Sequence, residues 1–222
     1  MNITVYGDSI LKGVLLENGR YVVNHNWEQR LSEDFGLTIR NRSRFGSTIQ
    51  KAMALIRRDV QTPPEEPEIA VLEFGGNDCD YDWAAISEHP EAAYDCKTPP
   101  PLFLERYREA VELLRRSGRI PVVLNLPPIH SEQYLQFICR NGLSRENILR
   151  WLGDVEAISR WQEKYSGLTE QAARETGAAV IDVRRAFPPA GAALRELLCA
   201  DGIHPSRAGQ ARIYGALRAA LG

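Results

Sequence analysis

Four short motifs in the chain carry side chains that are suited to acyl-transfer chemistry. Gly-Asp-Ser occupies residues 7–9, and an Asp-x-x-His motif near the other end of the chain contains Asp201 and His204. A serine hydroxyl is a weak nucleophile until a histidine takes its proton, and the histidine needs an acid to fix its tautomer. Asp201 and His204 are close enough on one turn-like stretch for the carboxylate to reach Nδ1 of the ring. Ser9, His204 and Asp201 are therefore a candidate set for activating a serine.

The other two motifs supply hydrogen-bond donors. Acyl transfer passes through a tetrahedral intermediate whose negative oxygen needs donors aimed at it. Ser-Arg-Phe-Gly occupies residues 43–46, and Gly-Gly-Asn-Asp occupies residues 75–78. Glycine amides can be approached without obstruction by a Cβ atom, and the side-chain amide of Asn77 also donates. Both segments are candidates for stabilising such an intermediate.

The elements that must position these motifs follow from the hydrophobic pattern. Short apolar runs alternate with longer amphipathic stretches, which predicts strands separated by helices. The expected strands are residues 3–6, 37–41, 69–74, 120–124 and 179–183. The expected helices are residues 26–35, 47–60 with Ser47 as N-cap, 102–116, two or three pieces between 131 and 176, and a last one from 206. Nearly continuous apolar strands are typical of a parallel sheet that is covered on both faces.

The motifs fall where such a sheet binds ligands, which is beyond the carboxyl ends of the strands. Three of them directly follow a predicted strand, and the Asp-x-x-His motif directly precedes the last helix. Each motif alone has a plainer explanation, because serine caps helices, Asn and Asp form turns, and Asp201 could cap the final helix. The occurrence of all four in this order favours a catalytic site.

The four blocks together resemble those of the SGNH (GDSL) hydrolase family, over essentially the whole chain. The resemblance implies that Ser9 is the nucleophile, His204 the general base and Asp201 the acid that orients it. It also implies an oxyanion hole formed by the amides of Ser9 and Gly46 and the side chain of Asn77. No metal or organic cofactor is required.

The resemblance also carries a fold. It implies an α/β protein, a flavodoxin-like three-layer α/β/α sandwich with a five-stranded parallel sheet, as the strand count independently suggests. Residues 1–222 are expected to form one domain. A chain of 222 residues with 44% apolar and 25% charged residues agrees with one soluble globular unit.

Two further acids and a histidine lie near these motifs. Asp182, in the last predicted strand, is the rival to Asp201 as the acid. Asp8, beside Ser9, is expected to support the loop, with substrate contact as the alternative. His130 follows the strand 120–124 and should face the cleft, where a substrate contact and a loop hydrogen bond remain equally open.

Two stretches that the sheet does not need, residues 79–101 and 127–153, are expected to set specificity. Tyr81 and Trp83 in the first are the candidate substrate contacts, because aromatic rings near a cleft can stack against sugar faces. The alternative is that the aromatic residues of both stretches cap the core beneath long loops.

Charge and cysteine usage exclude several classes of protein. A formal net charge of −2 gives no electrostatic case for binding nucleic acid or an anionic membrane surface. No apolar run approaches the ~18 residues of a membrane helix. The four cysteines have no metal-ligand spacing and are expected to be free thiols of a reduced compartment, so we expect a cytoplasmic protein without a metal.

The resulting hypothesis is a serine esterase that hydrolyses a small acyl ester, with an acetylated carbohydrate as the leading substrate. One alternative is an acyl thioesterase or lysophospholipase with the same reactive residues. Another, from a different class, is a non-catalytic flavodoxin-like binding module. The chain has no Gly-x-Ser-x-Gly elbow, so the α/β-hydrolase arrangement of such residues is not expected.

Overall fold

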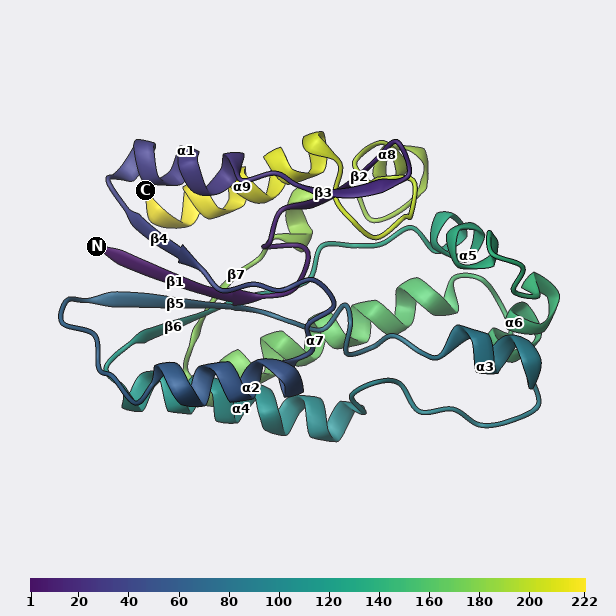
Figure 1. Cartoon of the computed structure of the whole chain (residues 1–222), viewed down its shortest axis with the longest axis horizontal. Coiled ribbons are helices and arrows are strands. Elements are labelled where there is room, and N and C mark those ends of the chain that lie inside the picture. The colour runs from purple at the N-terminus through teal and green to yellow at the C-terminus, as the bar shows by residue number, and fades with distance from the viewer.

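A five-stranded parallel sheet forms the centre of the molecule (Figure 1). The computed structural model describes residues 1–222. The strands lie in the order β4-β1-β5-β6-β7. Their bounds are β1 Asn2–Gly7, β4 Thr38–Asn41, β5 Glu68–Glu73, β6 Ile120–Leu124 and β7 Ala179–Ile181. This is the flavodoxin-like order, so the predicted fold class is confirmed.

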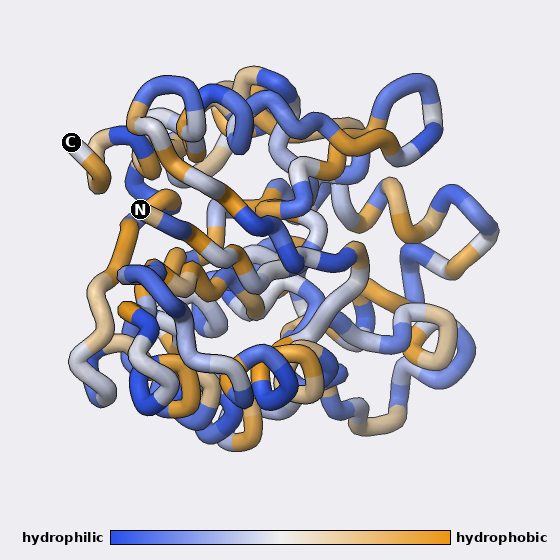
Figure 2. Tube along the Cα trace, turned by 60° about the vertical axis from the view of Figure 1, so that its left-hand side comes forward, coloured by the Kyte–Doolittle hydropathy of each residue, from blue (hydrophilic) through white to orange (hydrophobic).

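Helices cover both faces of the sheet and make three layers, as Figure 1 shows. The helices on one face are α1 (Asn26–Phe35) and α9 (Arg207–Leu221), and those on the other are α2 (Ile49–Asp59), α4 (Pro100–Arg116) and α7 (Ala157–Thr176). In Figure 2 the helical turns alternate between hydrophobic and hydrophilic residues, as expected for helices with one face on a sheet. Each layer of helices therefore buries its own hydrophobic cluster against the strands.

A third group of helices lies beyond the carboxyl ends of the strands. These are α3 (Trp83–Glu88), α5 (Ser131–Cys139) and α6 (Arg145–Leu152). They share a separate hydrophobic cluster with the start of α7. The three helices α5, α6 and α7 confirm the pieces expected between residues 131 and 176, whereas α3 falls in a stretch that was expected to be loop.

A β-hairpin that the sequence analysis did not predict connects β1 to α1. Its strands are β2 (Val14–Glu17) and β3 (Arg20–Val23), paired antiparallel. Asn18 and Gly19 form the turn with φ angles of 50° and 75°, the left-handed backbone that a two-residue hairpin turn requires. The Asn-Gly pair was therefore an available sequence signal.

Three smaller differences concern the start of α2, the end of β7 and two short helices. Thr48, not Ser47, is the N-cap of α2, since its hydroxyl accepts a hydrogen bond from Lys51 N at 3.2 Å. Strand β7 ends at Ile181, so Asp182 lies outside it. The short helices η1 (Arg184–Ala186) and α8 (Gly191–Glu196) were not predicted. None of the helices is both long and apolar enough to cross a membrane.

The cluster beneath α4 is expected to carry much of the stability. Phe103 is fully buried, with its ring 5.4 Å from that of Tyr107 and 4.9 Å from that of Tyr165. Phe103→Ala is expected to lower the free energy of unfolding by about 3–5 kcal/mol, measured by urea denaturation. Val180→Ala, at an exposed position of β7, is the control and should change it by no more than about 0.5 kcal/mol. Equal effects would contradict this placement of the core.

Candidate active site

The structure brings Ser9, His204 and Asp201 into one hydrogen-bonded line. Ser9 lies in the turn that directly follows β1, and its Oγ is 2.9 Å from Nε2 of His204. The other ring nitrogen of His204, Nδ1, is 2.7 Å from Oδ2 of Asp201. All three side chains are buried, with Ser9 the most exposed at 7%. This is the geometry in which a histidine can remove the serine proton while a carboxylate holds its tautomer.

The loop that carries Asp201 and His204 is fixed by its own backbone. Oδ1 of Asp201 accepts hydrogen bonds from the backbone N–H groups of Ile203 and His204 at 3.1 and 3.0 Å. Gly202 has a φ of +73°, and a Cβ atom there would lie 2.8 Å from the carbonyl oxygen of His130. Only glycine therefore allows this loop to pack so closely against the start of α5.

Asp201 is held in its charged form. Burial alone would raise the pKa of this carboxyl, but the hydrogen bond from the His204 ring, the charge of that ring and two backbone N–H groups outweigh it. The pKa of Asp201 is consequently lowered from its ordinary value. An ionised acid at this position stabilises the imidazolium that forms when His204 takes a proton.

The candidate oxyanion donors line the same cavity as Ser9. Ser9, Gly46, Asn77 and His204 line the same cavity, although they come from four separate segments of the chain. The Nδ2 group of Asn77 donates to Oδ2 of Asp8 at 2.9 Å, which uses one of its two hydrogens. The second hydrogen stays available to an oxygen in the cavity.

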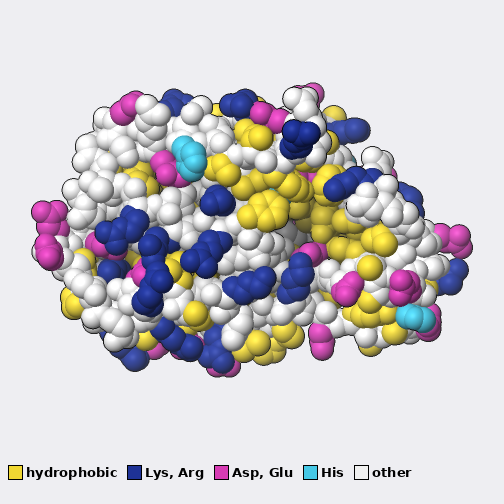
Figure 3. Space-filling view, viewed as in Figure 1, with side chains coloured by type: hydrophobic (Ala, Val, Ile, Leu, Met, Phe, Trp, Pro, Cys, Tyr) yellow, Lys and Arg dark blue, Asp and Glu magenta, His cyan; other side chains and the backbone are white.

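The cavity extends from Ser9 into an aromatic pocket and has a volume of about 340 Å³. We define the aromatic pocket by five residues of the predicted specificity stretches and α7. They are Tyr81, Trp83, Tyr134, Trp151 and Trp161. Figure 3 shows hydrophobic side chains gathered in the middle of one face and running toward the end that carries α3, α5 and α6. Tyr81 and Trp83 line the cavity and also pack in the hydrophobic cluster of α3, α5 and α6, so substrate contact stays a prediction for both.

The polar atoms of four pocket residues, Trp83, Tyr134, Trp151 and Trp161, are hydrogen-bonded within the protein, whereas the hydroxyl of Tyr81 is not. Oδ1 of Asp80 accepts from both Trp83 Nε1 and the Tyr134 hydroxyl at 2.8 Å, and its Oδ2 is 2.6 Å from Nζ of Lys97. The indole N–H groups of Trp151 and Trp161 donate to backbone carbonyls. Apart from the Tyr81 hydroxyl, the aromatic pocket therefore presents an apolar wall to whatever enters it.

Two further aromatic rings, which do not belong to the aromatic pocket, cover His204 on its solvent side. Tyr21 of β3 and Phe45 lie with their ring centres 5.3 and 5.9 Å from that of His204. Both are partly exposed, at 42% and 53%. Burial, followed by the charge of Asp201, raises the pKa of the Tyr21 hydroxyl to about 12, so this group stays neutral. Sequence reasoning missed this pair, because an exposed aromatic residue in a loop or hairpin carries no signal of its own.

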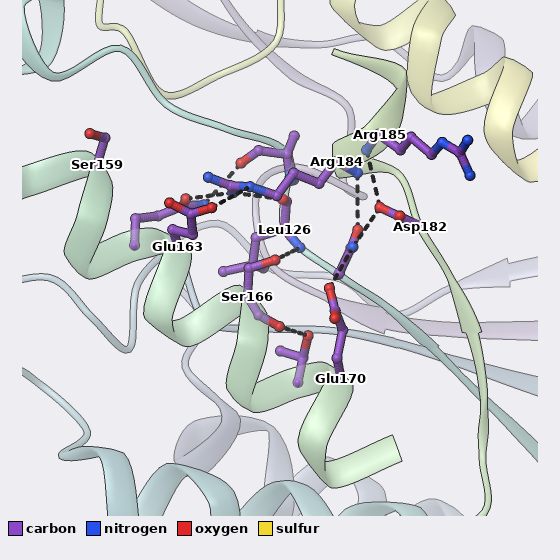
Figure 4. A network of polar contacts seen from close by, with 12 residues as sticks. Leu126, Ser159, Glu163, Ser166, Glu170, Asp182, Arg184 and Arg185 are labelled. Carbon is purple, nitrogen blue, oxygen red and sulfur yellow. Dashed lines mark hydrogen bonds and ion pairs between the residues drawn. The ribbon is translucent and has the colours of Figure 1, made fainter. Parts of the chain in front are cut away.

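Asp182, the rival acid, is bound in a different network (Figure 4). Its Oδ1 accepts from Asn125 Nδ2 at 2.7 Å and from Arg185 N at 3.0 Å. Arg184, in the same network, donates to the carbonyl oxygen of Leu126 at 3.2 Å and to Oε1 of Gln162 on α7 at 3.0 Å, and so holds the segment after β6 against α7. Asp182 thus supports a wall of the cavity, whereas Asp201 contacts His204.

His130 does not line the cavity that was expected to hold it. Its ring is the N-cap of α5, with Nδ1 accepting from Gln133 N at 3.3 Å, and its backbone N–H donates to Gly202 O at 2.8 Å. Of the two alternatives left open by the sequence, these contacts correspond to the loop hydrogen bond. Asp8 lines the cavity but contacts Asn77, as described above.

This fold and the arrangement of Ser9, His204 and Asp201 define a class of hydrolases. The chain belongs to the GDSL-like lipase/acylhydrolase family, whose model matches residues 5–212. The predicted family is therefore confirmed, and with it the prediction of a carboxylic ester hydrolase. A non-catalytic binding module is not supported. Among curated proteins none matches the chain.

Solved structures with the same fold cover nearly the whole chain. Axe2, an acetylxylan esterase from Geobacillus stearothermophilus, is 17% identical with a TM-score of 0.66, over 100% of this chain and 94% of its own. A lipase/acylhydrolase from Enterococcus faecalis is 19% identical with a TM-score of 0.63, over 99% and 94%. TesA is 19% identical with a TM-score of 0.62, over 100% and 98%. At these identities the likeness shows the fold.

The side chain of Asp78 connects two segments of the chain next to the candidate site. Its fully buried carboxyl accepts from the backbone N–H of Ile49 at 3.1 and 3.2 Å, which joins the turn after β5 to the first residue of α2. Burial raises the pKa of Asp78 to about 7. Between pH 4 and 7 the folded protein therefore keeps a proton that the unfolded chain loses, because an aspartate in the unfolded chain has a pKa of about 3.9.

Linkage gives the sign of the effect on stability. The free energy of unfolding falls as pH rises through this window, by up to about 1.4 kcal/mol per pH unit from this one group. Asp78→Asn removes this contribution. The free energy of unfolding of the variant, measured by urea denaturation, should therefore rise relative to that of the wild type as the pH increases from 4 to 7. Asp95→Asn, at an exposed position, is the control for loss of a carboxyl. A difference between Asp78→Asn and wild type that stays constant with pH would refute the buried acid.

Proposed function

We propose that the protein is a serine esterase in which Ser9 is the nucleophile. The observation that carries the proposal is the continuous line from Ser9 Oγ through His204 to Asp201, with distances of 2.9 and 2.7 Å. His204 takes the serine proton as Oγ attacks the ester carbonyl, and then gives that proton to the leaving alcohol. Asp201 holds the ring in the required tautomer.

The negative oxygen of the tetrahedral intermediate is stabilised by the amides of Ser9 and Gly46 and by Asn77 Nδ2. Collapse of the intermediate breaks the bond to the alcohol and leaves an acyl group on Ser9. Water, activated by the same His204, then releases the acid by the reverse proton movements. These steps require no metal or organic cofactor, and no three His, Cys, Asp or Glu side chains are grouped to hold a metal ion.

For the substrate we propose an ester of a small acyl group, with an acetylated carbohydrate as the leading choice. The leaving alcohol must lie near Nε2 of His204 to receive its proton, and the partly exposed rings of Tyr21 and Phe45 lie on that side. Aromatic faces pack well against the C–H faces of a sugar. Axe2, which has the same fold, is an acetylxylan esterase.

One observation favours a second candidate, the hydrolysis of longer acyl esters or thioesters. The cavity of about 340 Å³ is much larger than an acetyl group, and its aromatic pocket presents only the Tyr81 hydroxyl as a free polar group to a sugar. Buried sugar hydroxyls without partners would be unfavourable, whereas an apolar acyl chain needs none. The two candidates differ in which part of the substrate enters the aromatic pocket.

Ser9→Ala is expected to lower kcat for p-nitrophenyl acetate by roughly 10³–10⁶, because the nucleophile is removed. It should also abolish labelling by a fluorophosphonate probe. Ser47→Ala is the matched control, since Ser47 is buried and donates to a backbone carbonyl near the site without lining the cavity. Near-wild-type turnover by Ser9→Ala would contradict the proposed nucleophile.

The substrate is tested by two variants against a series of esters. If the acyl group is acetyl and the alcohol a sugar, Tyr21→Ala should raise KM for an acetylated xylooligosaccharide by roughly threefold to tenfold, as expected for the loss of one aromatic contact. Trp151→Ala should then leave acetate esters unaffected. Higher kcat/KM for octanoyl than for acetyl esters, lost in Trp151→Ala, would instead establish the second candidate.

A further inference from the structure

Two buried acids that the reaction does not use lie together below Asn77. Asp8 follows β1 and Glu73 is the last residue of β5, and each is only 1% exposed. The strands are neighbours in the sheet, with Gly7 opposite Glu73 in the register. The backbone N–H of Asp8 donates to Glu73 Oε2 at 3.4 Å. The parallel pairing of β1 and β5 therefore places both carboxyls in the same buried space.

Asp8 determines which way the side chain of Asn77 points. Its Oδ1 accepts from Ile10 N at 2.8 Å, and its Oδ2 accepts from Asn77 Nδ2 at 2.9 Å. Because an ionised carboxylate can only accept hydrogen bonds, the amide of Asn77 must turn its nitrogen toward Asp8. Its second N–H then points away from Asp8, and Asn77 lines the cavity that holds Ser9.

Glu73 is placed to keep Asp8 in this accepting state. Its Oε1 is buried without a hydrogen-bond partner, which is unfavourable for a carboxylate oxygen. A proton on Glu73 gives this carboxyl a hydrogen bond to donate, and Asp8, whose N–H already contacts Glu73 Oε2, is the neighbouring acceptor. Burial raises the pKa of both carboxyls, and that of Glu73, on which the charge of Asp8 also acts, lies well above its ordinary value.

No permanently positive side chain around Asp8 and Glu73 offsets the negative charge of the two carboxyls. Asp78, which follows β5, and Tyr107 of α4 act on the two carboxyls, and neither can be positive. His204 acts on Asp8 from the other side and is positive only when protonated. A single proton shared between Asp8 and Glu73 is therefore the simplest way to bury both.

We infer that Asp8 and Glu73 form a positioning pair that holds one proton and aims the free N–H of Asn77 at the carbonyl oxygen of the substrate. The inference rests on the proposed function, because it requires Asn77 to bind the oxyanion. It assigns to Asp8 a role in kcat without contact to the reacting atoms, and to Glu73 the role of keeping Asp8 ionised.

The first test is a double-mutant cycle on p-nitrophenyl acetate. Asn77→Ala should lower kcat by roughly 10²–10³. Asp8→Asn turns an N–H toward the donor of either Ile10 or Asn77 and so disturbs the position of Asn77. It should lower kcat by roughly 10- to 100-fold, which is less than the effect of Asn77→Ala, and leave KM little changed. If Asp8 acts through Asn77, the double variant should be no slower than Asn77→Ala alone.

The outcomes of this cycle separate the two proposals. If Asn77→Ala keeps wild-type kcat, the oxyanion assignment in the proposed function fails. If Asn77→Ala is slow but the two effects multiply in the double variant, the proposed function stands and the positioning role of Asp8 is overturned. Thermal unfolding of each variant shows whether lost activity reflects lost structure.

The second test uses Glu73→Gln, which keeps a donor for Asp8 but cannot lose a proton. Wild-type kcat is expected to fall at alkaline pH, because removal of the proton places two adjacent carboxylates beside Asn77. Glu73→Gln should keep near-wild-type kcat at neutral pH and retain it to higher pH. Glu170→Gln, on α7 and bonded to Asn125, is the control and should keep the wild-type profile. Identical profiles for wild type and Glu73→Gln would overturn the role of Glu73.

Discussion

The hydrogen bond between Ser9 and His204 joins residues 195 positions apart, and the rest of the structure serves to hold it. Ser9 follows β1, which lies inside the sheet between β4 and β5. His204 directly precedes α9, which packs with α1 over one face of that sheet. The two ends of the chain therefore meet at the site only if every strand and helix between them is in place. The activation of Ser9 that we propose is thus a property of the complete fold, since neither terminal segment can form the pair alone.

Much of the fold could be predicted because buried parallel strands are unusually apolar. Each of the five expected strands overlaps an observed one, and the helices between them begin and end near their predicted bounds. The hairpin β2–β3 was missed although Asn18 and Gly19 mark its turn, because its strands are only four residues long and the apolar residues Tyr21, Val22 and Val23 of the second are consecutive and all exposed. Helix α3 was missed because Trp83 and Ile86 bury themselves against α5, α6 and α7, a contact that local pattern does not reveal.

The site was predictable to the extent that its residues lie in motifs at the ends of strands. Ser9, Asn77 and the Asp201–His204 pair were named from the sequence. The structure places Ser9, Asn77 and His204 in one cavity, with Asp201 buried against His204. Glu73 could not be identified from motifs, because a glutamate near the end of an apolar run is usually interpreted as the exposed end of a strand. Its importance depends on the neighbouring strand β1, which brings Asp8 against it. Residues that act through others depend on tertiary neighbours, so spacing along the chain does not identify them.

The concentration of buried acids around Asn77 has a consequence for the evolution of this protein. Asp8, Glu73 and Asp78 are all buried, and none forms an ion pair with a lysine or arginine, so this edge of the sheet lowers the stability of the fold. Apolar or amide replacements there would be selected if thermostability were the only requirement. Given the positioning role that we propose for Asp8 and Glu73, their presence marks a trade-off between stability and activity, in which the fold tolerates a less stable region to keep the Asn77 amide correctly aimed. Attempts to stabilise the enzyme by substitution should therefore begin at the far end of the strands.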